Sequence, residues 1–154
     1  MNKLSRRQAM WIGSGAALWL MAPRPAMAVA AFPPVTAYRN PGCGCCGQWA
    51  ESMKKAGFAI TMTDDPALDE RRAKLGVPTA LAGCHLALVG NYVLEGHVPP
   101  EDVISFLAAN PDARGLAVPG MPMGSPGMEM GGTVEPYDVL TFTADGKSQV
   151  YAKH

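Results

Sequence analysis

The chain has 154 residues, 48% of them hydrophobic and 17% charged, and its 13 basic and 13 acidic side chains give a formal net charge of zero. This length suits one domain of ordinary size. The mixed apolar content and the lack of repeats exclude collagen-like, coiled-coil and wholly disordered chains. Without residues 1–28 the chain has 9 basic and 13 acidic side chains, a formal charge of −4. It therefore lacks the basic surface of a protein that binds nucleic acid or an anionic membrane.

Residues 1–28 are typical of an export signal. Basic residues come first, the apolar stretch Met10–Ala22 is too short for a transmembrane helix, and Ala26-Met27-Ala28 is an A-x-A cleavage site. Ser5-Arg6-Arg7 resembles a twin-arginine signal, and the ordinary Sec route stays open as well. No apolar run of about 18 residues follows the signal. We therefore expect residues 29–154 to form a single periplasmic domain that does not span a membrane.

The region after the signal begins with short apolar strands that alternate with amphipathic helices, separated by glycine, proline and asparagine turns. In chain order, we predict a strand over Val35–Arg39, a helix over Cys45–Ala56, a strand over Phe58–Met62, a helix that Asp65 caps and that runs from Pro66 to Gly76, strands over Leu81–Val89 and Tyr92–Val98, and a helix from Pro99 or Pro100 to Asn110. This β-α-β-α-β-β-α order is that of thioredoxin. The predicted fold is therefore α/β and thioredoxin-like, with a mixed sheet and flanking helices.

The last part of the chain combines an irregular segment with a hairpin. Residues Gly115–Gly132 are rich in glycine, proline and methionine, which predicts a loop with few contacts of its own and no core strand. Two strands, Tyr137–Thr143 and Ser148–Tyr151, then turn at Asp145-Gly146. We expect this C-terminal β-hairpin to complete the domain.

Three of the four cysteines lie within four residues, in Cys43-Gly44-Cys45-Cys46. This segment stands where the first strand gives way to the N-terminus of the first helix. Free backbone N–H groups and the helix dipole favour a thiolate at such a position, and the thiolate is the form that binds soft metals or attacks disulfides. Because glycines make the turn flexible, the three sulfur atoms are able to converge on one point.

The fourth cysteine can be placed by counting along the predicted hairpin. A two-residue turn at Gly90-Asn91 fixes the strand pairing and puts Cys84 directly opposite His97, on the same face of the sheet. The same alternation directs His85 to the other face, unless a bulge intervenes. In a thioredoxin fold this strand begins beside the helix that carries the cysteines, so we expect Cys84 to face them. Residues 77–82 are then an inserted segment.

Metal binding and redox chemistry both fit this cluster. Cys43 and Cys46 form a C-x-x-C pair, which suits a thiol-disulfide oxidoreductase, and an exported chain with four cysteines also suits a framework of inert disulfides. Cys45 favours metal binding, because a dithiol enzyme has no use for a third adjacent thiol. The two separated C-x-x-C pairs of a structural zinc site are missing.

The irregular segment carries a second group of sulfur atoms, in Met121, Met123, Met128 and Met130. Methionine usually fills cores, but turn-forming residues separate these four, with neither helical nor strand periodicity. Thioether, thiolate and imidazole are ligands that suit Cu(I) and not Mg²⁺, Ca²⁺ or Mn²⁺. The combination therefore predicts a copper site.

Five motifs cover nearly the whole region from Tyr38 to Tyr151: Cys43-Gly-Cys-Cys46-Gly-x-Trp49, Gly76-Val-Pro78, Cys84-His85, Glu95-Gly-His97-Val-Pro99 and Gly115-Leu-Ala-Val-Pro-Gly-Met121-Pro-x-Gly-Ser-Pro-Gly-Met128-Glu129. Together they resemble the CopG-type family, small bacterial periplasmic proteins often associated with copper resistance. The resemblance implies a thioredoxin-like fold and copper bound by the cysteine cluster.

The expected copper ligands are the four cysteines, Cys43, Cys45, Cys46 and Cys84. Further candidates are His97, His85 and the four methionines. The first hypothesis is a periplasmic protein that holds Cu(I), one ion or several, for copper resistance or homeostasis, with copper redox chemistry as a variant of it. Its expected partners are copper ions and other periplasmic copper-resistance proteins. The second hypothesis is a thiol-disulfide oxidoreductase that uses Cys43 and Cys46. The sequence leaves open whether the protein is an enzyme.

Overall fold

The computed structural model describes residues 32–129 and 131–154, so the predicted export signal and Met130 lie outside the described part. The described elements, in chain order, are β1 (Val35–Arg39), α1 (Gly44–Lys55), β2 (Ile60–Asp64), α2 (Leu68–Leu75), the short 3₁₀ helix η1 (Thr79–Leu81), β3 (His85–Val89), β4 (Tyr92–Glu95), α3 (Pro100–Ala109), β5 (Gly115–Ala117), β6 (Asp138–Phe142) and β7 (Ser148–Lys153).

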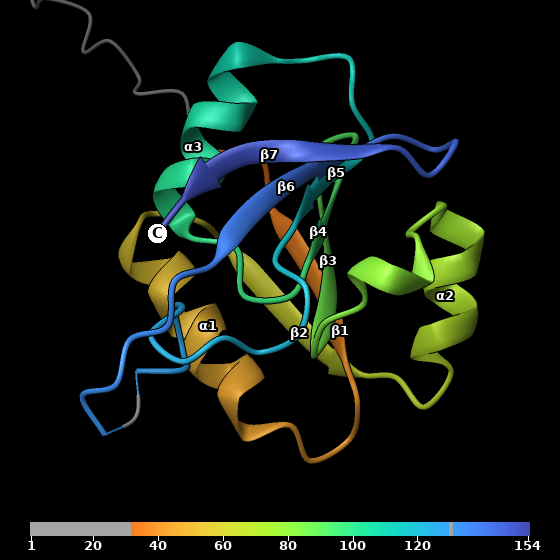
Figure 1. The fold of residues 1–154 in the computed structure, drawn as a ribbon. Coiled ribbons are helices and arrows are strands. Elements are labelled where there is room, and N and C mark those ends of the chain that lie inside the picture. The colour runs from red at the N-terminus through yellow and green to blue at the C-terminus, as the bar shows by residue number, and fades with distance from the viewer. Residues whose placement is uncertain (1–31, 130) are drawn as a thin grey trace, which may run out of the picture.

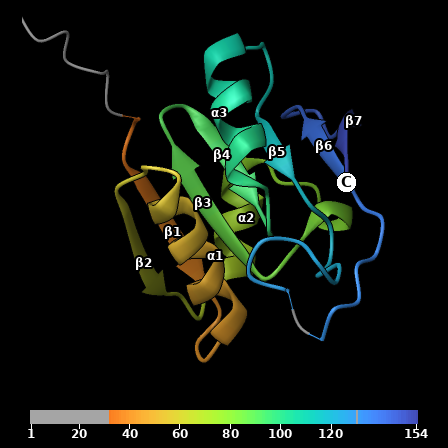
Figure 2. The same ribbon diagram turned by 90° about the vertical axis from the view of Figure 1, so that its left-hand side faces the viewer.

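The strands form one mixed sheet in the order β2-β1-β3-β4-β5-β6-β7. The pairs β1–β2 and β4–β5 are parallel, and the other neighbouring strands are antiparallel. Helices α1 and α3 pack on one face of the sheet and α2 packs on the other (Figures 1 and 2). The β3–β4 turn at Gly90 brings the start of β3 and the end of β4 side by side at the far end of this hairpin.

Apolar burial fixes these layers. Trp49 and Met53 of α1 and Phe106 of α3 are fully buried against one face of the sheet, whereas Leu68 of α2 is buried against the other face beside Leu86. Large buried side chains of this kind contribute about 1.5–3 kcal/mol each to folding. The indole N–H of Trp49 also donates a hydrogen bond to the carbonyl of Val98, at 2.9 Å, which ties α1 to the chain segment after β4.

The order of helices and strands up to α3 and the register of the β3–β4 hairpin agree with the sequence predictions. Val89 pairs with Tyr92 and Leu86 pairs with Glu95, as the turn at Gly90-Asn91 predicts. The mixed α/β architecture and the C-terminal hairpin are also as predicted. The likeness to thioredoxin stays a prediction.

The hairpin is shorter than predicted at the end that lies near the cysteines. Strand β4 ends at Glu95 and not at Val98, and β3 begins at His85. The reason is Gly96, whose φ of 73° is left-handed and ends the ladder. A side chain at Gly96 would collide with the carbonyl oxygen of Val118, so only glycine fits this crossing.

Helix α2 begins at Leu68, two residues later than predicted. The Asp65 carboxylate accepts the backbone N–H of Ala67 at 2.9 Å and so stabilises the turn before the helix, without capping the helix itself. The helix ends in a left-handed Gly76, as predicted.

The prediction that no core strand lies within Gly115–Gly132 is wrong. Strand β5, Gly115–Ala117, is fully buried between β4 and β6. Three residues are too short for a recognisable alternation, and Gly115 conceals the strand further. This glycine is required because any side chain there would overlap the backbone of Val93.

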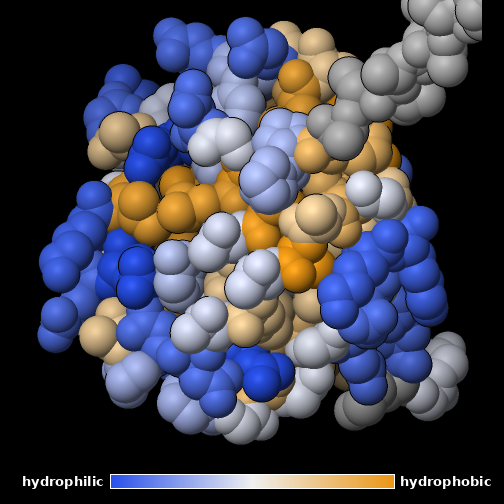
Figure 3. Space-filling model, turned by 180° about the vertical axis from the view of Figure 1, so that it is seen from behind, coloured by the Kyte–Doolittle hydropathy of each residue, from blue (hydrophilic) through white to orange (hydrophobic). Residues whose placement is uncertain are grey.

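Within the described residues, no helix has the length and apolar character needed to cross a membrane. Figure 3 shows the side of the molecule opposite to Figure 1, where a short hydrophobic band crosses a largely hydrophilic surface. The large hydrophobic side chains that are exposed in the described part are Met121, Val134 and Val150. One of them, Met121, is a predicted copper ligand.

Candidate metal centre

The first three cysteines lie at the N-terminus of α1. Cys43 is the residue that precedes the helix, and Cys45 and Cys46 belong to its first turn, where no side chain caps the free backbone N–H groups. The turn into the helix is held from both sides: the Cys43 N–H donates to the carbonyl of Asn40 at 3.2 Å, and Arg39 donates to the Cys43 carbonyl at 3.0 Å. This framework fixes the three sulfur atoms in a small volume.

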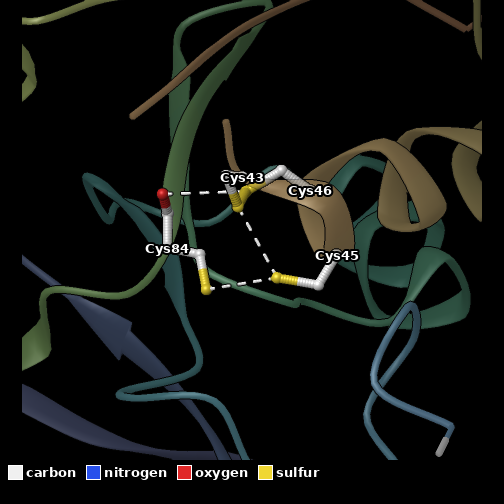
Figure 4. Close-up of side chains that lie close together, drawn as sticks. All are labelled: Cys43, Cys45, Cys46 and Cys84. Carbon is white, nitrogen blue, oxygen red and sulfur yellow. Dashed lines mark hydrogen bonds between the residues drawn. A yellow bond between two sulfur atoms is a disulfide. The ribbon is translucent and has the colours of Figure 1, made fainter. Parts of the chain in front are cut away.

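The fourth cysteine completes a cluster. Cys84 precedes β3 directly, and its side chain points toward the start of α1 (Figure 4). All four sulfur atoms lie within 4.8 Å of one another. The Cys45 sulfur is 3.5 Å from that of Cys43 and 3.7 Å from that of Cys84. The structure therefore brings together the four cysteines that the sequence predicted as ligands.

Two of the four cysteines in the cluster are oxidised to a disulfide and two are reduced. A disulfide joins Cys43 and Cys46, whereas Cys45 and Cys84 are free thiols. Burial raises the pKa of Cys84 to about 12, so this thiol is protonated at neutral pH. The disulfide thus joins the C-x-x-C pair that the sequence offers as an alternative redox pair.

His97 faces the cluster with its ring nitrogen Nε2, and its other ring nitrogen, Nδ1, has a partner outside the cluster. Its Nδ1 lies 2.8 Å from the carbonyl oxygen of Pro126, which is able only to accept a hydrogen bond, so we assign the hydrogen to Nδ1. Its Nε2 lies 3.3 Å from the Cys84 sulfur, so the two residues are neighbours as predicted, although the paired ladder itself ends at Leu86 and Glu95. Burial lowers the pKa of His97, which keeps the ring neutral. The Nε2 lone pair is therefore directed at the cysteines.

The prediction that His85 points to the other face is wrong. Its ring lies 5.0 Å from the ring of His97 and 4.2 Å from that of Trp49, on the α1 face of the sheet. The left-handed Gly96 turns the chain so that His97 returns to the face on which His85 lies. His85 is fully buried, and neither ring nitrogen has a hydrogen-bond partner. Burial lowers the pKa of His85 well below its usual value, so it is neutral.

The methionine segment makes more contacts than its composition predicts. Gly127 packs so closely on α1 that a side chain there would lie 2.6 Å from the backbone nitrogen of Trp49. Met121 is 55% exposed and lines a pocket of about 360 Å³ together with Cys43 and Cys84. Met123 and Met128 are half-buried. Of the three predicted methionine ligands that the structure describes, Met121 is thus the one that shares this pocket with Cys43 and Cys84.

Two charged residues that the sequence did not single out as part of the site, Arg72 and Glu95, lie behind the cluster. Both are buried and form an ion pair at 2.8 Å beside Gly83. Burial raises the pKa of Glu95, and the Arg72 guanidinium opposes that shift. A glutamate in the otherwise apolar strand Tyr92–Glu95 is the signal that points to such a pair, because an isolated charge is not tolerated there.

Comparison with known proteins gives a consistent result. A family described as a protein of unknown function, DUF411, matches residues 81–128. Two solved structures of a copper resistance protein, copG, are similar to the chain. Form 1 has a TM-score of 0.75 and 36% sequence identity, over 80% of this chain and 98% of that chain. Form 2 has the same TM-score and identity, over 79% of this chain and 98% of that chain. No curated protein matches the chain.

Proposed function

Because the chain belongs to the CopG-type family, we propose that it is a periplasmic copper-binding protein that holds Cu(I) in its cysteine cluster for copper resistance or homeostasis. The observation that carries this proposal is the convergence of four cysteine sulfur atoms within 4.8 Å. Thiolates are soft ligands that select Cu(I), and four of them in one pocket are able to bridge more than one ion.

His97 is the next ligand in this proposal. A metal-ligating histidine commonly donates its second ring N–H to a backbone carbonyl, which fixes the ring and the tautomer. The contact between Nδ1 and the Pro126 carbonyl has this form, and it leaves Nε2 facing Cys84. Met121 lines the same pocket as Cys43 and Cys84, which supports it as a further ligand. His85 and the other methionines, Met123, Met128 and Met130, are weaker candidates.

Copper loading requires reduction of the disulfide. With Cys43 and Cys46 joined, two thiols remain, and reduction supplies the other two. Each thiol that binds copper gives up its proton, so loading releases protons. The protein then binds copper ions as cargo. We propose that residues 1–28 direct export and that other periplasmic copper-resistance proteins are its partners.

Copper titration of the protein purified from the periplasm tests this proposal. The reduced, anaerobic protein should bind more than one Cu(I) per chain, measured by elemental analysis after removal of loosely held metal. The same preparation with the Cys43–Cys46 disulfide kept intact is the control and should bind less. Absence of tightly held copper in the reduced protein would contradict the proposal. The intact mass of the same sample locates the cleavage site.

The second candidate function is thiol-disulfide exchange, and the Cys43–Cys46 disulfide is the observation that favours it. Against it, the Cys45 thiol lies 3.5 Å from the Cys43 sulfur and offers an internal competitor for any mixed disulfide. We therefore expect the metal-free protein to reduce a disulfide substrate slowly. Robust turnover that copper does not inhibit and that Cys43→Ser abolishes would favour the oxidoreductase.

A further inference from the structure

A buried ion pair lies directly behind the cysteine cluster. Glu95 is fully buried and Arg72 nearly so, and the two side chains meet at 2.8 Å across the α2 face of the sheet. Replacement of a buried ion pair by apolar residues is often neutral or stabilising, because both charges lose their hydration. One carboxylate oxygen of Glu95 has no hydrogen-bond partner at all. Stability alone therefore gives little reason for this pair.

The pair binds both backbone polar groups of Gly83, its N–H and its carbonyl oxygen. Glu95 accepts the backbone N–H of Gly83 at 2.7 Å, and Arg72 donates to the Gly83 carbonyl oxygen at 2.7 Å. The same Glu95 oxygen accepts from Arg72 Nε at 3.0 Å, so the three groups form one closed network. Charge-assisted hydrogen bonds of this kind are short and directional. The position of Gly83 is thus set from two directions.

Gly83 is the residue before Cys84, and it lies outside the regular ladder of β3, which begins at His85. Backbone packing is tight here, because a side chain at Gly83 would lie 2.7 Å from the Cα of Gly96. An isolated bridge to Gly120 is the other backbone support of this point. The hydrogen bonds of Arg72 and Glu95 therefore fix the backbone of Gly83, which the regular sheet pairing does not reach.

We propose that Arg72 and Glu95 are positioning residues that hold Cys84 against the other cysteines by fixing the backbone of Gly83. The contacts at stake are those of the Cys84 sulfur, 3.7 Å from Cys45 and 3.3 Å from His97 Nε2. For copper binding this inference rests on the function proposed above. The position of Cys84 itself is measurable without metal.

The test uses charge-neutral double variants, because removal of one partner alone would bury an unpaired charge. The double variant Arg72→Met/Glu95→Leu (Met/Leu) removes both side-chain hydrogen bonds to Gly83, whereas Arg72→Met/Glu95→Gln (Met/Gln) keeps an acceptor for the Gly83 N–H. The matched control is the charge-neutral Arg71→Met/Asp65→Asn, which removes the neighbouring ion pair, at 2.6 Å, and keeps an acceptor for the Ala67 N–H. Loss of an outer-shell partner costs about 10–100-fold in metal affinity. We expect a loss of affinity in this range for the Met/Leu double variant, a smaller loss for the Met/Gln double variant and none for Arg71→Met/Asp65→Asn.

The metal-free measurement is the rate at which diamide joins Cys45 to Cys84. Two thiols lose two electrons and two protons to the N=N bond of diamide and form one disulfide. Misplacement of a reacting group by about 1 Å costs on the order of 100-fold in rate. We expect Met/Leu to slow this step at least about tenfold while its thermal stability equals or exceeds that of the parent.

The two measurements separate the two proposals. A parent that binds no Cu(I), with slow disulfide formation in Met/Leu, would contradict the copper function and support the positioning role. Disulfide formation at the parental rate in Met/Leu would overturn the positioning role, whatever copper does. If Met/Leu does not fold, Met/Gln decides by the same two measurements, because it retains a polar partner for Gly83.

Discussion

The thiols and the methionines are both soft sulfur ligands, but the fold treats them differently. The thiols come from the first turn of α1 and from the residue before β3, and all four sulfur atoms lie within 4.8 Å of one another. The three methionines that the structure describes, Met121, Met123 and Met128, lie on an irregular segment whose Gly127 packs against the first turns of α1. Met121 is 55% exposed, and Met123 and Met128 are half-buried.

The difference indicates two roles. Elements that are fixed by the core place the thiols before any metal arrives, so little ordering is left for the metal to cause. A thioether on an irregular segment is able to adapt, but its contribution to affinity is reduced by the cost of ordering it. We therefore expect the cysteines to determine whether copper binds, and the methionines to adjust how it binds.

Loss of one thiol should have the largest effect. Cys84→Ser removes the sulfur that closes the cluster opposite α1, with its sulfur 3.7 Å from that of Cys45. We expect Cu(I) affinity to fall by more than the roughly 10–100-fold that loss of an outer-shell partner costs. Competition with a Cu(I) chelator measures this change. Met53→Leu, which alters another buried sulfur-bearing residue of α1, should leave the affinity unchanged; equal losses in both variants would contradict the role of the cluster.

The pH dependence of binding should be nearly as large. The pKa of Cys84 is raised to about 12 by burial, so below that pH copper has to displace a proton from this thiol. Apparent Cu(I) affinity should therefore rise with pH, by about tenfold per unit for each displaced proton, and it should fall as the pH drops. Chelator competition at several pH values measures the slope. The slope should be lower by about one in Cys84→Ser, and an unchanged slope would mean that Cys84 keeps its proton.

Local rules predict much of this site. The two-residue turn at Gly90-Asn91 sets the β3–β4 register as far as Leu86 and Glu95, and Cys84 and His97 lie next to each other just beyond the end of that ladder. A strand followed by a turn and a helix likewise predicts the position of Cys43, Cys45 and Cys46. These features depend on residues close together in the chain, and sequence patterns report such local geometry well.

The remaining features depend on contacts between distant segments. The left-handed Gly96 crosses under Val118, and this crossing, invisible in the hairpin alone, brings His85 and His97 to the same face. Strand β5 is defined by its neighbours β4 and β6 and not by its own three residues. The Arg72–Glu95 pair joins a helix to a strand 23 residues later. No local periodicity encodes such pairings.

Replacement of the two histidines should change different properties of the protein: Cu(I) affinity for His97 and folding stability for His85. His97→Ala removes the nitrogen that lies 3.3 Å from the Cys84 sulfur, and we expect about 10–100-fold weaker Cu(I) binding. His85→Leu removes two buried nitrogens that have no partner, and we expect the metal-free protein to become about 1 kcal/mol more stable. Denaturant unfolding measures the second change. Weaker copper binding in His85→Leu than in His97→Ala would instead identify His85 as the principal imidazole ligand.

Replacement of the methionines should have the smallest effect on Cu(I) affinity. Met→Leu exchange keeps the apolar volume, costs less than about 1.5 kcal/mol in stability and removes only the sulfur lone pairs. We expect Met121→Leu to weaken Cu(I) binding by less than about tenfold, below the range for an outer-shell partner. Met123→Leu and Met128→Leu are the matched controls and should change it less, because Met121 shares the pocket with Cys43 and Cys84.

The metal specificity of this small effect distinguishes a ligand from a packing residue. Thioether binds Cu(I) but is a poor ligand for Zn²⁺, which prefers thiolate and imidazole. The variant with all four methionines changed to leucine should therefore lose affinity or stoichiometry for Cu(I) and keep its Zn²⁺ binding, in side-by-side titrations with the parent. Copper should also protect residues 118–129 from proteolysis in the parent more than in the variant. If Cu(I) binding and protection are both unchanged, the methionines only pack, and the segment serves as a cover for the thiols because the Pro126 carbonyl and Gly127 already hold it against His97 and α1.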